Sequence, residues 1–325
     1  MSGAVTCRLA EPAEREAVVR FLDEHWGAKH PLVHLPDFFT FYYDHGDGLQ
    51  FAFAEDETGP VAVVGYILAN RAPRPDIWVS IWCAKKKHNG AGLELMAALP
   101  GLTGARVMAC NNIRPKTMAF YEFLGYTAAR LPHYYRLADR PAYRVARVAE
   151  KVFLPVPQGP ALRRVPDEAA LAQAYRPVET LRPCKDVWYL SRRYFHYPRQ
   201  RYDVWQLDGA LLVTRTAQLE DARVLRIVDY VGRPEAFPAL GPGIDRLLRE
   251  TGAEYADCYC AGIPTAVMAA AGFAERGADC PNIIPNYLDP PLIENTEYYY
   301  FTSDPENFMM FKADGDQDRP NLSVE

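Results

Sequence analysis

The sequence has few cysteines, few histidines, no long apolar run and no excess of basic residues. Its seven cysteines are an odd number scattered over 325 residues, which argues against a disulfide scaffold and favours reduced thiols. No apolar stretch reaches the length of a membrane-spanning helix, and the first residues lack the apolar core of a signal peptide. The net charge of −5 argues against a nucleic-acid partner, because counterion release requires a basic face. We therefore expect a cytoplasmic protein whose partners are neither membranes nor nucleic acids.

An apolar content of 49% with 24% charged residues is typical of a globular protein. A chain of 325 residues is long for one core, so two domains are expected. The segment Arg140–Pro160 carries four prolines and alternating charges, as linkers do. We place the domain boundary near residue 150, which gives domains 1–150 and 151–325.

A weak internal repeat supports this division. Val61–Leu68 has a counterpart in Ala210–Ala217, 149 residues later, and Ile77–Cys83 has one in Leu225–Val231, 148 residues later. The offset is 148 for the strand that begins at Ala105 and 147 for the helix that contains Ala119. Four elements that keep one offset within two residues indicate two copies of a single α/β unit, each with a mixed sheet flanked by helices.

The segment Ile77–Tyr126 combines the features that a phosphate-bearing ligand requires. An apolar strand, Ile77–Cys83, is followed by the cationic turn Lys85–Gly92 and a helix over Leu93–Leu99. A second strand, Ala105–Cys110, leads to another helix. Glycines let the backbone approach a ligand closely, and the first N–H groups of a helix bind phosphate. The turn therefore predicts a pyrophosphate site.

The second copy lacks this turn chemistry. At the same offset Lys87 becomes Glu235 and Gly90 becomes Pro238. A displaced loop at Gly241–Gly243 contains Pro242, which has no N–H to offer. We therefore expect only the first copy to bind the ligand.

These motifs resemble those of the GNAT superfamily of acyl-CoA transferases. Lys87-x-x-Gly90-x-Gly92 is similar to the family's phosphate loop, with Lys in the first position. Phe120-Tyr121-x-x-x-Gly125-Tyr126 is similar to its later helix, although Arg114 stands where the family usually has Asn. The resemblance implies two tandem GNAT-like domains that use acetyl-CoA or another acyl-CoA as co-substrate and no metal. It assigns acyl-CoA binding to Ile81, Trp82, Cys83, Lys87, His88, Asn89, Gly90, Ala91, Gly92 and Arg114.

Tyr121 is the first catalytic candidate, because the resemblance makes it the donor of a proton to the CoA sulfur; the alternative is a half-buried helix aromatic. Four of the seven histidines lie within Asp23–His45. A histidine titrates near neutrality and can take a proton from an ammonium substrate. We select His30 as the base, with solvated loop histidines as the alternative, and assign His25 and Trp26 to the acceptor.

The second half contains Arg192-Arg193-Tyr194-Phe-His196-Tyr-Pro198, which suits an anionic ligand with a ring. A basic surface turn is the alternative. With His25-Trp26-x-x-x-His30 and the ending Asp314–Asn321, it resembles tandem GNAT proteins that acylate nucleotide-linked sugars in polysaccharide biosynthesis. The resemblance implies that the acceptor is the amino group of a nucleotide-linked amino-deoxysugar. Its substrate contacts are assigned to Arg193, Tyr194, His196, Asp229 and Tyr230, the last two with an edge-strand polar pair as the alternative.

Two alternative functions remain, and a calcium site is excluded. Asp314, Asp316 and Asp318 do not form a calcium loop, because Arg319 stands where the loop requires Gly; a turn-rich tail that folds onto the second domain is expected instead. An aminoacyl-tRNA-dependent transferase is opposed by the acidic balance. A CoA-binding sensor without turnover is opposed only by Tyr121 and the glycine turn.

Overall fold

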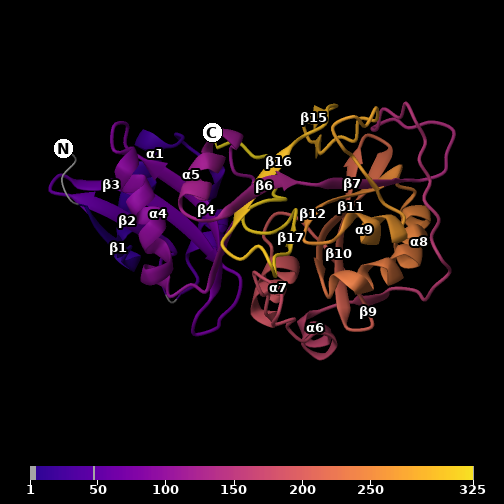
Figure 1. Ribbon diagram of the computed structural model, residues 1–325, viewed down its shortest axis with the longest axis horizontal. Helices are drawn as coiled ribbons and strands as arrows, with labels where there is room; N and C mark the ends of the chain where they lie inside the picture. Colours follow the sequence, from indigo (N-terminus) through magenta and orange to yellow (C-terminus); the bar gives the residue numbers. More distant parts are fainter. Residues whose placement is uncertain (1–4, 47, 325) are drawn as a thin grey trace. The chain divides into compact units, whose positions relative to one another are not determined.

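The computed structural model describes residues 5–46 and 48–324, with all of their side chains except that of Asn89. Its helices and strands form two compact units (Figure 1). The first unit contains Met1–Ala128, Tyr300–Pro305 and Leu322–Glu325, and the second contains Ala129–Tyr299 and Glu306–Asn321. The mixed α/β architecture predicted from the sequence is confirmed.

The first unit is built on a seven-stranded sheet. Its strands β4 and β5 run parallel, whereas β1–β2, β2–β3, β3–β4 and β5–β16 are antiparallel. Strand β5 is entirely buried, and β3 is buried along most of its length, as expected for strands covered on both faces. In order across the sheet the strands are β1 (Thr6–Leu9), β2 (Phe51–Asp56), β3 (Gly59–Leu68), β4 (Asp76–Ala84), β5 (Val107–Asn111), β16 (Tyr298–Thr302) and β6 (Thr127–Leu131). The helices are η1 (Pro12–Glu14), α1 (Arg15–His25), α2 (Pro31–His34), α3 (Pro36–Tyr43), α4 (Asn89–Thr103), η2 (Pro115–Thr117) and α5 (Met118–Phe123).

The second unit contains an eight-stranded sheet. Along its main path the order is β13 (Ala274–Glu275), β7 (His133–Leu137), β12 (Tyr255–Ala261), β11 (Ala222–Val231), β10 (Ala210–Leu219), β9 (Asp203–Leu207) and β8 (Arg163–Val165), and β17 (Met310–Phe311) pairs with β12. A separate hairpin joins β14 (Tyr287–Leu288) to β15 (Pro291–Leu292). The helices are α6 (Glu168–Ala174), α7 (Val187–Phe195), η3 (Pro234–Leu240), α8 (Gly241–Thr251) and α9 (Thr265–Ala270).

The predicted repeat is visible in the pairing of the strands. In the first unit Ile77 of β4 lies opposite Met108 of β5, and in the second unit Leu225 of β11 lies opposite Ala256 of β12. Both pairs are parallel, and both positions are 148 residues apart. The register also shifts at corresponding places, after Gly65 in β3 and one repeat later in β10. The two sheets therefore share one topology through their central strands.

Each sheet also contains a strand from the other half of the chain. Strand β16 lies between β5 and β6 in the first sheet, and β7 lies between β12 and β13 in the second. The division of the chain therefore falls after Ala128, earlier than the boundary predicted near residue 150. The proline-rich linker suggested the later position, but β7 precedes that linker and pairs with β12 of the second unit.

Three further features bear on the sequence predictions. The turn-rich tail packs into the second unit as expected, with Asp314, Asp316 and Asp318 all buried. All seven cysteines are free thiols. Within residues 5–46 and 48–324, no helix is both long enough and apolar enough to cross a membrane.

Candidate active site

The first component of the site is the free edge of strand β4. Its parallel ladder with β5 ends at Trp78 and Ala109. In the part of the chain that the structure covers, Val79–Ala84 have no strand partner on that side, although their other side pairs with β3. The predicted residues Ile81, Trp82 and Cys83 lie in this segment, so their backbone groups can bind an extended ligand as an added strand would.

The second component is the cationic turn after β4. Lys87 has a left-handed backbone with φ 73°, and His88 is the N-cap of α4. The helix begins at Asn89, earlier than the predicted start at Leu93, so Gly90, Ala91 and Gly92 form its first turn. The first N–H groups of a helix lack partners within the helix, and its dipole places positive charge there. The turn is therefore suited to a phosphate group.

The two glycines of this turn differ in their surroundings. A Cβ at Gly90 would meet no atom of the protein within 4 Å, whereas one at Gly92 would lie 3.3 Å from the Cβ of Ala84 and from Nε1 of Trp82. The indole Nε1 of Trp82 also donates a hydrogen bond to the carbonyl of Gly92 at 3.0 Å. Gly92 thus allows close packing of α4 on β4, and Gly90 leaves the end of the helix accessible.

The corresponding helix of the second unit is covered. The helix η3 occupies the turn before α8, and the linker packs onto the first residues of α8. A Cβ at Gly243 would lie 2.4 Å from Cγ of Leu162, and one at Gly241 would lie 3.0 Å from Val156. The backbone at the start of the second helix is therefore packed against other side chains, whereas that of Gly90 is open; that only the first copy binds the ligand stays a prediction.

Tyr121 of α5 is almost fully buried, with 4% of its surface exposed. Its ring centroid lies 4.2 Å from that of Phe301 and 5.5 Å from that of Trp82. Burial raises the pKa of its hydroxyl well above the usual value, Cys110 raises it further, and a hydrogen bond with Thr117 lowers it. The hydroxyl stays protonated at neutral pH, as a proton donor must.

Two other predicted residues flank this region. Arg114 is exposed and is the N-cap of η2. Burial raises the pKa of Cys83 to about 11, so its thiol is protonated at neutral pH and is a poor nucleophile.

The structure places the predicted histidines around α1 and α2. The ring of His25 contacts Phe21, with centroids 4.8 Å apart, and the rings of Trp26 and His30 lie 4.3 Å apart. His30 is the N-cap of α2, and its Nδ1 accepts a hydrogen bond from the backbone N–H of Leu32 at 3.3 Å. That ring nitrogen is thus engaged in capping a helix.

One pair was missed by the sequence analysis. Nε2 of His34 lies 2.6 Å from Oδ1 of Asp23. When this carboxylate accepts the Nε2 proton, Nδ1 of His34 carries the lone pair that a base requires. The two residues are 11 positions apart across a helix end, a spacing that has no recognisable motif.

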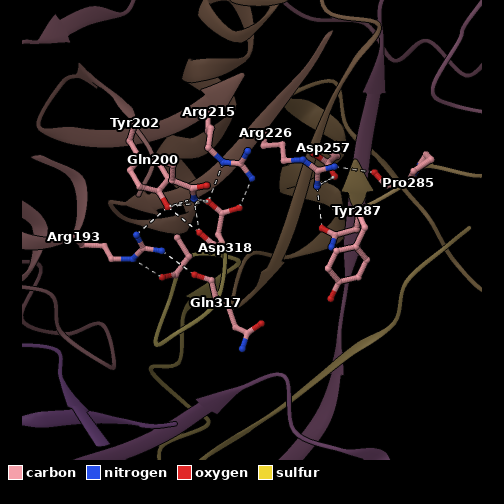
Figure 2. Close-up of polar contacts among 12 residues, drawn as sticks. Arg193, Gln200, Tyr202, Arg215, Arg226, Asp257, Pro285, Tyr287, Gln317 and Asp318 are labelled. Carbon is pink, nitrogen blue, oxygen red and sulfur yellow. Dashed lines mark hydrogen bonds and ion pairs between the residues drawn. The ribbon is translucent and has the colours of Figure 1, made fainter. Parts of the chain in front are cut away.

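The residues predicted to hold the acceptor in the second half are mostly buried. Arg193 is 2% exposed, and its guanidinium donates hydrogen bonds to the carbonyls of Ala313 and Gln317 and to the hydroxyl of Tyr202 (Figure 2). The contacts seen for Arg193 therefore fasten the tail to α7. His196, in contrast, is 59% exposed and contacts Glu168.

Asp229 is the centre of a second buried group. Its carboxylate accepts hydrogen bonds from Nζ of Lys185 and the hydroxyl of Tyr194, both at 2.5 Å, and from the backbone N–H of Tyr230 at 2.8 Å. Lys185 also contacts Asp314 of the tail at 2.6 Å. These hydrogen bonds indicate a structural role for Tyr194, Asp229 and Tyr230. Their contact with substrate stays a prediction.

The comparisons with known proteins concern the fold. No family model and no curated protein matches the chain. A GCN5-related N-acetyltransferase from Anabaena variabilis aligns with a TM-score of 0.51 and 11% identity over 92% of this chain and 72% of that chain. One from Kribbella flavida aligns with a TM-score of 0.51 and 13% identity over 92% and 71%. The chain therefore has the fold of GNAT N-acetyltransferases along most of its length.

A metal centre finds no support in the side chains. Across the described residues, no group of three or more His, Cys, Asp or Glu side chains is placed to hold a metal ion.

Proposed function

We propose that the first unit binds acyl-CoA and transfers its acyl group to an amine. The observation that carries this proposal is the accessible first turn of α4 beside the free edge of β4, together with the covered counterpart in the second unit. The GNAT fold supports the same assignment.

In this proposal the pyrophosphate lies at Gly90–Gly92, where Lys87 adds positive charge and His88 is the N-cap of the helix. The pantetheine arm runs along Ile81–Cys83 as an added strand, and the exposed Arg114 contacts the cofactor from the start of η2. The backbone groups of β4 supply the hydrogen bonds, so the side chains of this strand are constrained only by packing.

Once the amine is neutral, the reaction requires two further proton movements. The amine nitrogen attacks the thioester carbon, the new C–N bond forms and the C–S bond breaks, and the proton that the nitrogen then loses passes to the tyrosinate that remains when Tyr121 has protonated the thiolate. Tyr121 donates a proton to the departing thiolate, and its raised pKa keeps the hydroxyl protonated until that step. A histidine accepts the proton of the ammonium form before attack.

His30 and His34 are the candidates for this base. His30 was selected from the sequence, and its stacking on Trp26 supports a place at the surface of an acceptor site. The pair of His34 with Asp23 supports the second candidate, because a carboxylate fixes the ring and leaves one nitrogen to take a proton. We favour His34 on this ground.

The proposed acceptor is the amino group of a nucleotide-linked amino-deoxysugar, and this choice is supported by the sequence motifs. The test measures thiol release from acetyl-CoA with a panel of amino-sugar nucleotides and with simple amines. Turnover with amino-sugar nucleotides alone is the expected result. Binding of acetyl-CoA without turnover on any amine would instead favour a sensor, and no binding of acetyl-CoA would overturn the proposal.

A further inference from the structure

Two arginines of the second unit lie directly opposite each other on neighbouring strands. Arg215 of β10 and Arg226 of β11 are partners in the antiparallel register. The Cα atoms of such partners are about 4.5–5.5 Å apart, and their side chains lie on the same face. Like charges in this position repel and destabilise a sheet. The pair therefore requires negative charge nearby.

The chain supplies part of this charge. Asp318 of the tail accepts hydrogen bonds from Nε and Nη2 of Arg215 at 3.2 and 2.7 Å (Figure 2). Asp257 of β12 lies 3.2 Å from Nη1 of Arg226 and also contacts His133 at 3.3 Å. Neither Nη1 of Arg215 nor Nε of Arg226 bonds any atom of residues 5–46 or 48–324. Each guanidinium group therefore has N–H donors that no atom of the described residues accepts.

A cavity of about 280 Å³ lies against this pair. Three of its lining residues are arginines, namely Arg215, Arg226 and Arg319, and Asp289 is the one acidic residue among them. Arg226 is buried at its base, with 4% of its side chain exposed. Neutral polar side chains complete the wall, among them Gln200, Gln218, Asn286 and Tyr287.

The arginines that line the cavity also affect the pKa of two buried groups of the tail. Burial lowers the pKa of Lys312 well below its usual range, and the charges of Arg226 and Arg319 lower it further. Although burial alone would raise the pKa of Asp318, the charges of Arg215, Arg193 and Arg226 hold it well below its usual value. Several cations therefore act on one carboxylate.

We propose that this cavity binds a phosphate group, either inorganic phosphate or the phosphate of a small phosphorylated sugar. A phosphate monoester carries about −1.5 to −2 charges and three acceptor oxygens. Guanidinium forks match these oxygens with two hydrogen bonds each. The ligand would take the donors of Arg215 and Arg226 that Asp318 and Asp257 leave over.

The size and lining of the cavity limit which ligands can bind there. At about 280 Å³ it lies just below the range of pockets that hold drug-sized ligands. Its lining residues fall within 200–289 and 319–321, and all of them belong to the second unit. The site is therefore separate from the acyl-CoA site proposed for the first unit and does not depend on it.

The experiment measures binding to the full chain by calorimetry and by the shift in melting temperature. The probes are inorganic phosphate, glucose 6-phosphate and glucose, at constant ionic strength set with chloride. We expect phosphate and glucose 6-phosphate to bind and to raise the melting temperature, and glucose to do neither. Tighter binding of glucose 6-phosphate than of phosphate identifies a sugar phosphate as the ligand, and equal binding identifies the free anion. No binding of either at millimolar concentration overturns the proposal.

Three variants connect the binding to this cavity. Arg319→Gln, which removes a positive charge, and Arg215→Lys, which keeps the charge but removes the two-donor fork, should each weaken phosphate binding at least about 10-fold. Asp318→Asn should strengthen it about 10-fold, because Arg215 then lacks its internal counter-ion. Arg164→Gln, which loses an exposed ion pair with Asp203 on the same sheet, is the control and should bind as the wild type does. Should Asp318→Asn and Arg319→Gln both bind phosphate with the wild-type affinity, the site is not here.

Discussion

The ring of Phe301 stacks on that of Tyr121, with centroids 4.2 Å apart and planes at 19°. The two residues are far apart in the sequence, yet both belong to the first unit, because β16 pairs with β5 there. The proposed proton donor is thus held between Trp82 of β4 and a strand from the end of the chain. This arrangement fixes the ring and excludes water from its hydroxyl.

Tyr121→Phe should lower kcat about 10- to 1000-fold and leave the affinity for acetyl-CoA nearly unchanged. The hydroxyl acts on the sulfur only as the C–S bond breaks, so its loss appears in the chemical step. Steady-state kinetics with saturating acceptor measure the change. Tyr126→Phe is the matched control, because Tyr126 also stacks on Phe301, at 5.4 Å. An equal loss in both variants would assign Tyr121 to packing.

Gly90→Val should abolish tight binding of acetyl-CoA without unfolding the protein. The new side chain would meet no protein atom within 4 Å of its Cβ, but it would stand where phosphate approaches the backbone. Calorimetry measures the affinity, and Gly101→Val in the same helix, where the space is equally open, is the control. If Gly90→Val binds acetyl-CoA as well as Gly101→Val does, the pyrophosphate lies elsewhere.

The pH profile of kcat should identify the base. For a histidine base, the rate rises as the pH passes the pKa of the ring, since the deprotonated ring takes the proton. His34→Asn should remove this rise and lower kcat, whereas His30→Asn should keep the rise and change the KM of the acceptor. The reverse pattern would restore His30 as the base. His196→Asn should raise the KM of the acceptor more than it lowers kcat.

His133 should make the stability depend on pH between about 4 and 6.5. It is fully buried, and its Nδ1 accepts a hydrogen bond from Nε of Arg276 at 2.9 Å. Its pKa falls from 6.5 to about 4, chiefly because of burial; Asp257 opposes this shift, and the charges of Arg276 and Arg226 add to it. As the pH falls, His133 is protonated in the unfolded chain at a higher pH than in the folded protein. The free energy of unfolding is therefore at its full value above the unfolded-state pKa, and it decreases as the pH falls from there to the folded-state pKa.

Across that pH window, His133 should lower the free energy of unfolding by about 3 kcal/mol, because each unit of pKa difference corresponds to about 1.4 kcal/mol. Urea unfolding at several pH values measures it. His133→Gln should flatten the dependence, and the exposed His196→Gln should leave it as in the wild type. An unchanged slope in His133→Gln would assign the acid sensitivity to other groups.

The central strands and the glycine turn could be predicted from the sequence because their signals are local. An apolar strand such as Ile77–Cys83, the cationic turn Lys85–Gly92 and a constant offset of about 148 residues require no knowledge of distant contacts. That β7 joins the second sheet and β16 the first could not be predicted, because the sequence of a strand does not indicate which sheet it pairs with. The boundary near residue 150 rests on the linker, and the two compact units exchange at Ala128 because of these strands.

The site was predicted less completely than the fold. Arg193 and Tyr194 have the chemistry of ligand-binding residues, but here Arg193 binds the backbone carbonyl of Ala313 in the tail and Tyr194 binds the carboxylate of Asp229 in β11. Composition does not distinguish these uses. The pair of Asp23 and His34 and the pair of Arg215 and Arg226 depend on helix ends and strand register, which become visible only in three dimensions.

The place of β16 in the first sheet also governs the order in which the protein can fold during synthesis. Among residues 5–46 and 48–324, β6 pairs with the rest of that sheet through β16, whose last residue is Thr302. While the ribosome is still translating the second unit, the first sheet ends at β5, and the residue that stacks on Tyr121 has not yet been made. The first unit therefore acquires its finished form only when nearly the whole chain has been translated, so a nascent fragment of its first 150 residues should remain open to proteases and chaperones.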